Sequence, residues 1–292
     1  MTPTTGSIEG LKAYADFMAA PEGRIRVPVS QKVVRGIDLH RRLRDPAVPL
    51  DRTILVPRIE GELPIVDDRL SGMAEMIVHP DGRGVRTFSG NLAHENGWWP
   101  DHKRRTLQHW EGMAQRSALV RAATEFRINW VQTEACWLCF PIGDDWFEWC
   151  CDLWVDVVDG PDELWEIKRD ERQLEDARYR LKLAGVDEIC RRMGKRFRLV
   201  MADEIELNRH HRDNMELFAS RRFVTITPDH MRRFESFAMR QGVEATYGEL
   251  ANHIDPPCTA RGAAVVQGLT CRRRIEIDLR SRLVNTTPLR IH

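Results

Sequence analysis

Three charged residues are spaced so that they could hold a metal ion and assist a hydrolytic reaction. Asp152 follows an apolar segment, and Glu166 and Lys168 flank Ile167 further along the chain. Side chains alternate along a strand, so Glu166 and Lys168 project from one face while Ile167 projects from the other. The pattern predicts a strand surface that carries an acid beside a base.

A hairpin would bring the first acid to the same surface. Residues 159–162 read Asp-Gly-Pro-Asp, which is a strong turn signal between two apolar segments. If the turn is centred on its middle two residues, Lys168 pairs opposite a residue close to Leu153. Asp152 then lies at the same end of the ladder, and we expect the two acids and the lysine to converge.

This convergence suits metal-assisted hydrolysis of a phosphodiester. Carboxylates are ligands that Mg²⁺ prefers, and the ion offsets charge that develops on the phosphate. Asp152 and Glu166 are therefore candidate ligands for Mg²⁺, for which Mn²⁺ could substitute. Lys168 could orient or deprotonate the attacking water or stabilise the transition state, and Glu111 is the candidate third ligand. The alternative is a solvent-exposed hairpin without a catalytic role.

The elements that must position these residues are indicated by apolar spacing. A proline-free helix is expected from Thr106 to Phe126 and would carry Glu111. The order of helix, antiparallel strands, helix and strand predicts an α/β core within residues 96–220. After the first helix we expect a three-stranded meander, a long helix and a last strand, at Cys136–Phe140, Trp146–Val158, Glu163–Lys168, Leu174–Met193 and Phe197–Met201.

Two segments flank this core. Residues 1–95 are an N-terminal extension that prolines interrupt, with short strand-like pieces at Arg52–Val56 and Met76–His79. Residues 221–292 are expected to follow the plan of a winged helix. Its helices and strands are expected at Asp229–Arg240, Thr246–His253, Thr259–Thr270, Ile275–Leu279 and Leu289–Ile291.

The amino-acid composition bears on membrane association, cellular location and DNA binding. The net charge is zero, and no apolar run approaches the roughly 20 residues of a membrane span. We therefore expect no membrane association, a cytoplasmic location without a secretory signal, and reduced thiols at the seven scattered cysteines. Any DNA affinity must come from local basic clusters, each of which, taken singly, is more typical of a solvated face than of a phosphate contact. The candidates are Lys103, Arg104, Arg105, Arg261, Arg272, Arg273 and Arg274.

A second metal hypothesis involves Cys136, Cys139, Cys150 and Cys151, which could supply four thiolates to zinc. Adjacent cysteines on a strand point to opposite faces, so reduced cysteines in or beside a core are the favoured interpretation. The pair His210-His211 is interpreted as part of a solvated linker.

Five short motifs lie in the stretch from about Trp98 to Leu217. They are Lys103-Arg104-Arg105, Trp110-Glu111, Cys151-Asp152, Glu166-Ile167-Lys168 and Arg212-Asp213-Asn214-Met215. With these motifs the stretch resembles the TnsA family, the endonuclease subunit of heteromeric transposases. Two positions depart from the family: Gln115 stands where the family commonly carries a second glutamate, and Cys151 replaces a proline before the aspartate.

The resemblance implies a restriction-endonuclease-like core of the PD-(D/E)XK superfamily, a mixed sheet flanked by helices, followed by a C-terminal winged-helix domain. It implies that Glu111, Asp152, Glu166 and Lys168 cut double-stranded DNA at the 5′ ends of a mobile element. A DDE-type transposase subunit and an AAA+ ATPase regulator would be the partners. The alternatives are a stand-alone phage or restriction-like nuclease and a non-catalytic DNA-binding or assembly module.

Overall fold

The computed structural model describes residues 53–55, 74–79, 82–86, 95–143 and 145–292. The chain divides into two compact units, each assembled from separate stretches. Unit 1 contains the residues up to Trp98, Gln108–Gly112 and Val131–Met201, and unit 2 contains Trp99–Leu107, Met113–Trp130 and Ala202–His292. The fold is mixed α/β with several sheets and no barrel. Within the described part of the chain, no helix combines the length and apolar character needed to span a bilayer.

Unit 1 contains most of two four-stranded sheets. The first has the order β1-β2-β6-β7, and its neighbours are antiparallel. The second has the order β10-β9-β8-β5, with β8 antiparallel and β10 parallel to β9. The strands are β1 (Thr53–Leu55), β2 (Glu75–Val78), β5 (Ile128–Thr133), β6 (Cys136–Ile142), β7 (Asp145–Cys150), β8 (Leu153–Val157), β9 (Glu163–Lys168) and β10 (Arg196–Met201).

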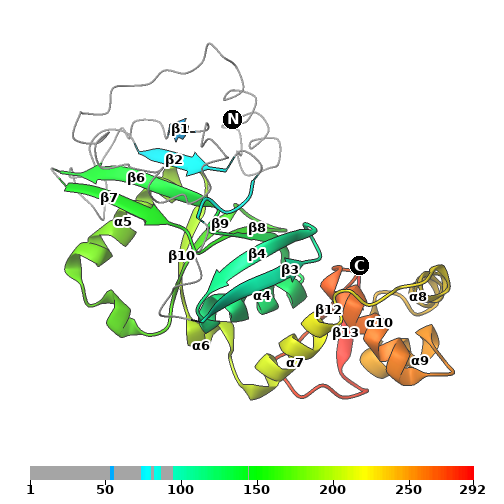
Figure 1. Ribbon diagram of the computed structural model, residues 1–292. Coiled ribbons are helices and arrows are strands. Elements are labelled where there is room, and N and C mark those ends of the chain that lie inside the picture. The colour runs from blue at the N-terminus through cyan, green and yellow to red at the C-terminus, as the bar shows by residue number, and fades with distance from the viewer. Residues whose placement is uncertain (1–52, 56–73, 80–81, 87–94, 144) are drawn as a thin grey trace, which may run out of the picture. The chain divides into compact units, whose positions relative to one another are not determined.

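Helix α5 (Ala177–Arg192) makes the crossover that a parallel β9–β10 pair requires, and it packs against β10 and β7 (Figure 1). A short 3₁₀ turn, η2 (Glu171–Leu174), precedes it. The helix approaches closely at Gly185, where an added Cβ would lie 2.5 Å from Cε2 of Phe140 on β6. Strands β6, β8 and β9 are buried at nearly every position, as expected for apolar strands covered on both faces.

The expected helix from Thr106 to Phe126 is wrong over its first third. Thr106–Glu111 forms strand β4, which pairs with β3 (Asn96–Asp101), and helix α4 begins at Met113 and ends at Thr124. Gly112 separates the two elements with a φ of 80°, a conformation that favours glycine. Glu111 therefore lies at the end of a strand and not on a helix.

The expected meander is also wrong, because Trp146–Val158 is two strands in different sheets. The chain changes partners between Cys151, whose N–H donates to Cys136 O (3.1 Å), and Asp152, whose N–H donates to Trp165 O (3.0 Å). The β8–β9 register pairs Leu153 with Trp165, not with Lys168. Continuing this register by one step places Asp152 across from Glu166.

Other expected elements of unit 1 are confirmed. The helix predicted for Leu174–Met193 is present as η2 and α5, and the strand predicted for Phe197–Met201 lies within β10. The strand-like pieces of the first 95 residues contain β1 and most of β2, and β2 pairs with β6. The expected division at residues 95 and 220 stays a prediction.

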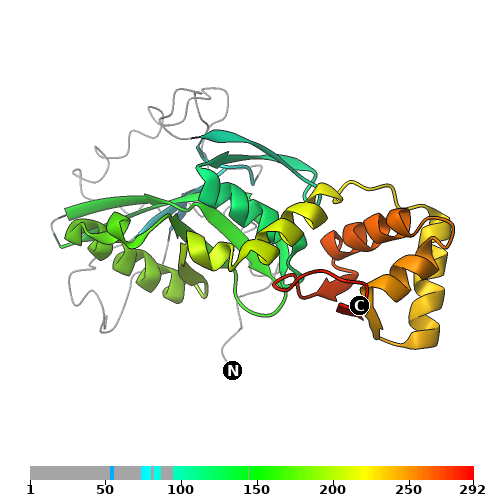
Figure 2. The ribbon, with the colours of Figure 1, turned by 90° about the horizontal axis from the view of Figure 1, so that it is seen from below.

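Unit 2 is mostly helical, and the three helices and last strand expected after residue 221 are confirmed. Thr227 and Thr246 cap the first two of these helices, and each forms a reciprocal capping box. Figure 2 shows α8, α9 and α10 gathered side by side, in gold to orange. The elements are α4, α6 (Ala202–Ile205), α7 (Arg209–Ser220), α8 (Pro228–Gln241), β11 (Glu244–Thr246), α9 (Tyr247–Ile254), α10 (Thr259–Cys271), β12 (Ile275–Ile277) and β13 (Pro288–Ile291), with the sheet order β11-β13-β12.

Candidate active site

Asp152 and Glu166 lie side by side where β8 pairs with β9. The carboxylate of Asp152 accepts a hydrogen bond from the backbone N–H of Ile167 at 2.6 Å. Together with the bond from the Asp152 N–H to Trp165 O, this contact orients the side chain along β9. The change of partner strand at Asp152 is thus what brings this acid to the acid-lysine pair.

Glu166 is held from three directions. The Trp149 indole on β7 donates to Oε2 at 2.5 Å, and the Tyr179 hydroxyl on α5 donates to Oε1. Lys168 Nζ lies 2.5 Å from the same Oε1 and 4.9 Å from the centre of the Tyr179 ring. Glu166 is 4 % exposed, and both of its carboxylate oxygens accept hydrogen bonds. Sequence reasoning missed Trp149 and Tyr179, because no local spacing connects them to the hairpin.

A second cluster of charges surrounds Arg86. Its Nη2 lies 2.5 Å from Glu111 Oε2, and its Nε lies 3.5 Å from Glu134 Oε2. Glu134 is buried between β5 and β6 with a φ of 47°, and its N–H donates to Asp152 O at 3.1 Å. Its Oε2 receives no hydrogen bond, so the longer contact with Arg86 is electrostatic. Sequence reasoning missed Glu134, whose only signal was an acid between two apolar strands.

Two acids of the site are buried so deeply that their pKa values rise despite the nearby cations. Burial, followed by the charge of Glu166, raises the pKa of Asp152 to about 8, despite the Ile167 N–H and Lys168. Burial also raises the pKa of Glu134 to about 8, with Asp152 and Glu111 adding to the shift and Arg86 opposing it. Burial alone would lower the pKa of Arg86, but its acidic neighbours raise it. A cation bound near these acids would favour their ionised forms and so lower their pKa values.

The donor set fits a magnesium ion only in part. In the described stretches, no group of three or more His, Cys, Asp or Glu side chains is gathered closely enough to hold a metal ion. Mg²⁺, however, commonly binds one or two carboxylates, retains water and takes further oxygens from phosphates. Asp152 and Glu166 supply the two carboxylates, but the Glu166 oxygens are engaged by Trp149, Tyr179 and Lys168. Glu111 is likewise engaged by Arg86.

The cysteines offer no comparable centre. None of the seven, all of which lie in the described residues, forms a disulfide, and the sulfurs of Cys136 and Cys151 are 3.5 Å apart. The hydrogen bond that Cys136 donates to Cys151 and burial raise the pKa of Cys136, and burial raises that of Cys150, so both remain thiols near neutral pH. His211 is not part of a solvated linker: it is buried on α7, and its Nδ1 accepts from the Leu207 N–H at 3.3 Å.

The basic residues expected to meet DNA fall into two groups. Several are occupied within unit 2: Lys103 Nζ donates to Ala122 O (2.7 Å) and Ile128 O (2.6 Å), and Arg261 is paired with Asp255. Arg104 and Arg274 stack on aromatic rings, those of Trp130 (4.7 Å) and Phe234 (5.6 Å). Arg105, Arg272 and Arg273 line a cavity together with Lys103, and Arg272 and Arg273 also donate to the backbone carbonyls of Val224 and Phe126. Which of the seven contact DNA stays a prediction.

Comparison with models of known protein families finds no match to this chain, and comparison with curated proteins finds no significant relative.

Proposed function

We propose that this protein is a metal-dependent DNA endonuclease of the PD-(D/E)XK type. The observation that carries the proposal is the arrangement of Asp152, directly before β8, with Glu166 and Lys168 on β9. The Asp152 carboxylate accepts the Ile167 N–H, and the Lys168 ammonium is 2.5 Å from Glu166 Oε1. This combination can hold a cation against a phosphate and assist a water molecule in the same place.

Each residue would have a distinct task. Asp152 and Glu166 would hold Mg²⁺ or Mn²⁺, which when bound neutralises charge on the phosphate and favours ionisation of a water molecule. Lys168 would orient or deprotonate that water or stabilise the pentavalent transition state. Trp149 and Tyr179 would keep the Glu166 carboxylate in position by their hydrogen bonds.

Glu111 joins the metal site only if its ion pair with Arg86 opens. Arg86 supplies positive charge to Glu111 and Glu134 at the distances reported above. A divalent cation would compete with it for the same carboxylates. The third-ligand role of Glu111 is therefore proposed for the metal-loaded protein.

The place of this activity in transposition rests on the TnsA-like motifs. The order α8, β11, α9, α10, β12, β13 supports a winged-helix assignment for residues 221–292, and the β8–β9–α5–β10 segment supports a restriction-endonuclease-like core. On this proposal the protein cuts double-stranded DNA at the 5′ ends of a mobile element. A DDE-type transposase subunit and an AAA+ ATPase would act with it.

Nicking of supercoiled plasmid in Mg²⁺ or Mn²⁺, with and without candidate partner proteins, tests the proposal. We expect Asp152→Asn and Lys168→Ala to lower the rate by about 100-fold or more. The matched controls Asp159→Asn and Arg169→Ala alter exposed residues of the same hairpin and should cleave like wild type.

Full activity in Asp152→Asn and Lys168→Ala would exclude this site. A wild-type protein that binds DNA yet stays inert with every partner would replace the nuclease with a non-catalytic assembly module. Cleavage without partners would favour a stand-alone nuclease.

A further inference from the structure

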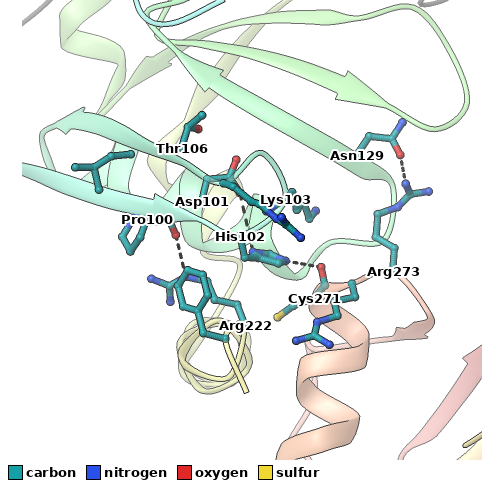
Figure 3. Close-up of a pocket in the computed structure, with 13 residues that line it drawn as sticks. Pro100, Asp101, His102, Lys103, Thr106, Asn129, Arg222, Cys271 and Arg273 are labelled. Atoms are coloured by element: carbon teal, nitrogen blue, oxygen red, sulfur yellow. Dashed lines mark hydrogen bonds and ion pairs between the residues drawn. The ribbon is translucent and has the colours of Figure 1, made fainter. Parts of the chain in front are cut away.

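Unit 2 contains a positively charged cavity of about 1000 Å³ (Figure 3). Its wall includes one acidic side chain, Asp101, whose Oδ1 accepts the Lys103 backbone N–H at 2.9 Å. His102 adds little positive charge, since burial lowers its pKa. The cationic lining residues are Lys103, Arg105, Arg222, Arg272 and Arg273. An excess of cations of this size attracts an anionic ligand.

The cavity is assembled from segments that lie far apart in the sequence. Residues 100–107 contribute the connection between β3 and β4, and Asn129 comes from β5. Arg222 and Phe223 follow α7, and residues 271–273 end α10. The fold thus brings together two basic clusters, 103–105 and 272–274, and adds an arginine from outside both. No local spacing in the sequence connects these segments.

Several of the guanidinium groups are held in place by backbone carbonyls. Arg222 donates from Nε to Pro100 O (3.1 Å) and from Nη1 to Ala219 O (2.6 Å), and Arg272 donates from Nη2 to Val224 O (2.9 Å). Arg273 donates from Nε to Phe126 O (2.9 Å) and from Nη1 to Asn129. An arginine has five N–H donors, so each keeps donors for a ligand. Anchoring reduces the rotamer entropy lost on binding.

Arg105 and Phe223 add an exposed cation and an exposed ring. Arg105 lies at the β3–β4 connection with a φ of 56°, a conformation that few residues other than glycine adopt. Phe223 is 56 % exposed, and its ring centre is 4.8 Å from the Arg222 guanidinium carbon. Arg222 also stacks on Trp99 at 4.0 Å. Guanidinium groups interleaved with aromatic rings are typical of surfaces that bind phosphates and stacked bases.

The wall also has unmet hydrogen-bonding capacity. Asp101 Oδ2 and His102 Nδ1 are buried and receive no hydrogen bond. His102 Nε2 lies 2.8 Å from Cys271 O and must donate to it, so Nδ1 of the neutral ring is an acceptor. Both atoms are acceptors, so an occupant with N–H or O–H donors suits this part of the wall better than an apolar one.

We propose that this cavity binds a nucleotide segment of a DNA strand, with Arg105, Arg222 and Arg272 contacting backbone phosphate and Phe223 stacking on a base. Its volume is in the range of small-ligand sites and holds a nucleotide rather than the body of a duplex. An acidic peptide would satisfy the cations but would give Phe223 no stacking partner. The inference rests on the proposed function in one respect, that the substrate is DNA.

Fluorescence anisotropy with the full chain in EDTA, where metal-dependent cleavage is blocked, tests this binding site. The probes are a labelled 30-nucleotide single strand and the matching duplex, titrated at several salt concentrations. The test variant combines Arg105→Asn, which tolerates the left-handed backbone, with Arg272→Gln. The control combines Arg282→Gln with Arg290→Gln, which removes the same charge from exposed positions outside the cavity.

We expect the cavity variant to weaken single-strand binding by about 10-fold or more and to reduce the slope of log K against log salt by about 1.4, or 0.7 for each lost phosphate contact. Phe223→Ala should weaken single-strand binding more than duplex binding. Equal affinities and slopes in the cavity and control variants would overturn the proposal. Binding of labelled polyglutamate that depends on the cavity and exceeds that of the single strand would also overturn it, in favour of an acidic protein partner.

The cavity proposal and the nuclease proposal can fail independently of each other. DNA binding that depends on the cavity, in a protein whose wild type never cleaves, would leave the cavity assignment standing and remove the enzymatic one. Cleavage lost in Lys168→Ala, together with unchanged binding in the cavity variant, would do the reverse.

Discussion

Replacing Glu134 by glutamine should stabilise the protein, and increasingly so as pH rises. Glu134 is 5 % exposed, and burial raises the pKa of its carboxyl from 4.5 to about 8. In the unfolded chain the group ionises at its ordinary pKa, so the folded state binds more protons between these two values. The free energy of unfolding of the wild type must therefore fall as pH rises through this window. Glutamine imitates the protonated side chain and removes that dependence.

The size of the effect follows from the shift. Each pKa unit corresponds to about 1.36 kcal/mol, so a rise from 4.5 to about 8 sets an upper bound of roughly 5 kcal/mol. Structural relaxation and water entry reduce such values, and glutamine weakens the contact with Arg86. We expect a net gain of about 1–2 kcal/mol at pH 8 and almost none at pH 5.

Urea unfolding in EDTA at pH 5, 6, 7 and 8, followed by tryptophan fluorescence, measures this difference. Glu235→Gln, a change at an exposed position, is the matched control and should leave the pH dependence unchanged. A Glu134→Gln protein that loses stability in parallel with wild type from pH 5 to pH 8 would refute the burial argument. A variant less stable than wild type at pH 8 would show that the ion pair with Arg86 outweighs burial.

Three further predictions address the same unit. Arg86→Gln removes the cation that pairs with Glu111 and should tighten Mn²⁺ binding by about 10-fold in calorimetry, whereas weaker binding would mean that Arg86 supports the site. Tyr179→Phe removes one hydrogen bond to Glu166 and should lower the nicking rate by about 10-fold without changing DNA affinity, and an unchanged rate would contradict a positioning role. Gly185→Ala places a Cβ 2.5 Å from Phe140 and should lower the free energy of unfolding by about 1–3 kcal/mol, so equal urea midpoints would contradict the close packing of α5.

The sequence by itself determined which segments become strands and helices wherever the signals were local. Capping residues, prolines and apolar spacing located α8, α9, α10 and β10 to within a few residues. The alternation of side chains along Glu163–Lys168 correctly gave Glu166 and Lys168 a common face, and the two are in contact. These features depend on neighbours within a few positions, so one sequence is enough to predict them.

Only the tertiary structure decided how distant segments meet. The break at Cys151 and Asp152 arises because the two residues pair with different strands, and it sets the β8–β9 register that the turn sequence alone misplaced. Burial, which depends on the whole fold, gives Glu134 its raised pKa and makes Lys103 a structural cation. The contacts of Trp149 and Tyr179 with Glu166 likewise join separate elements, because sheet pairing and packing, unlike helix propensity, bring together residues without any fixed spacing.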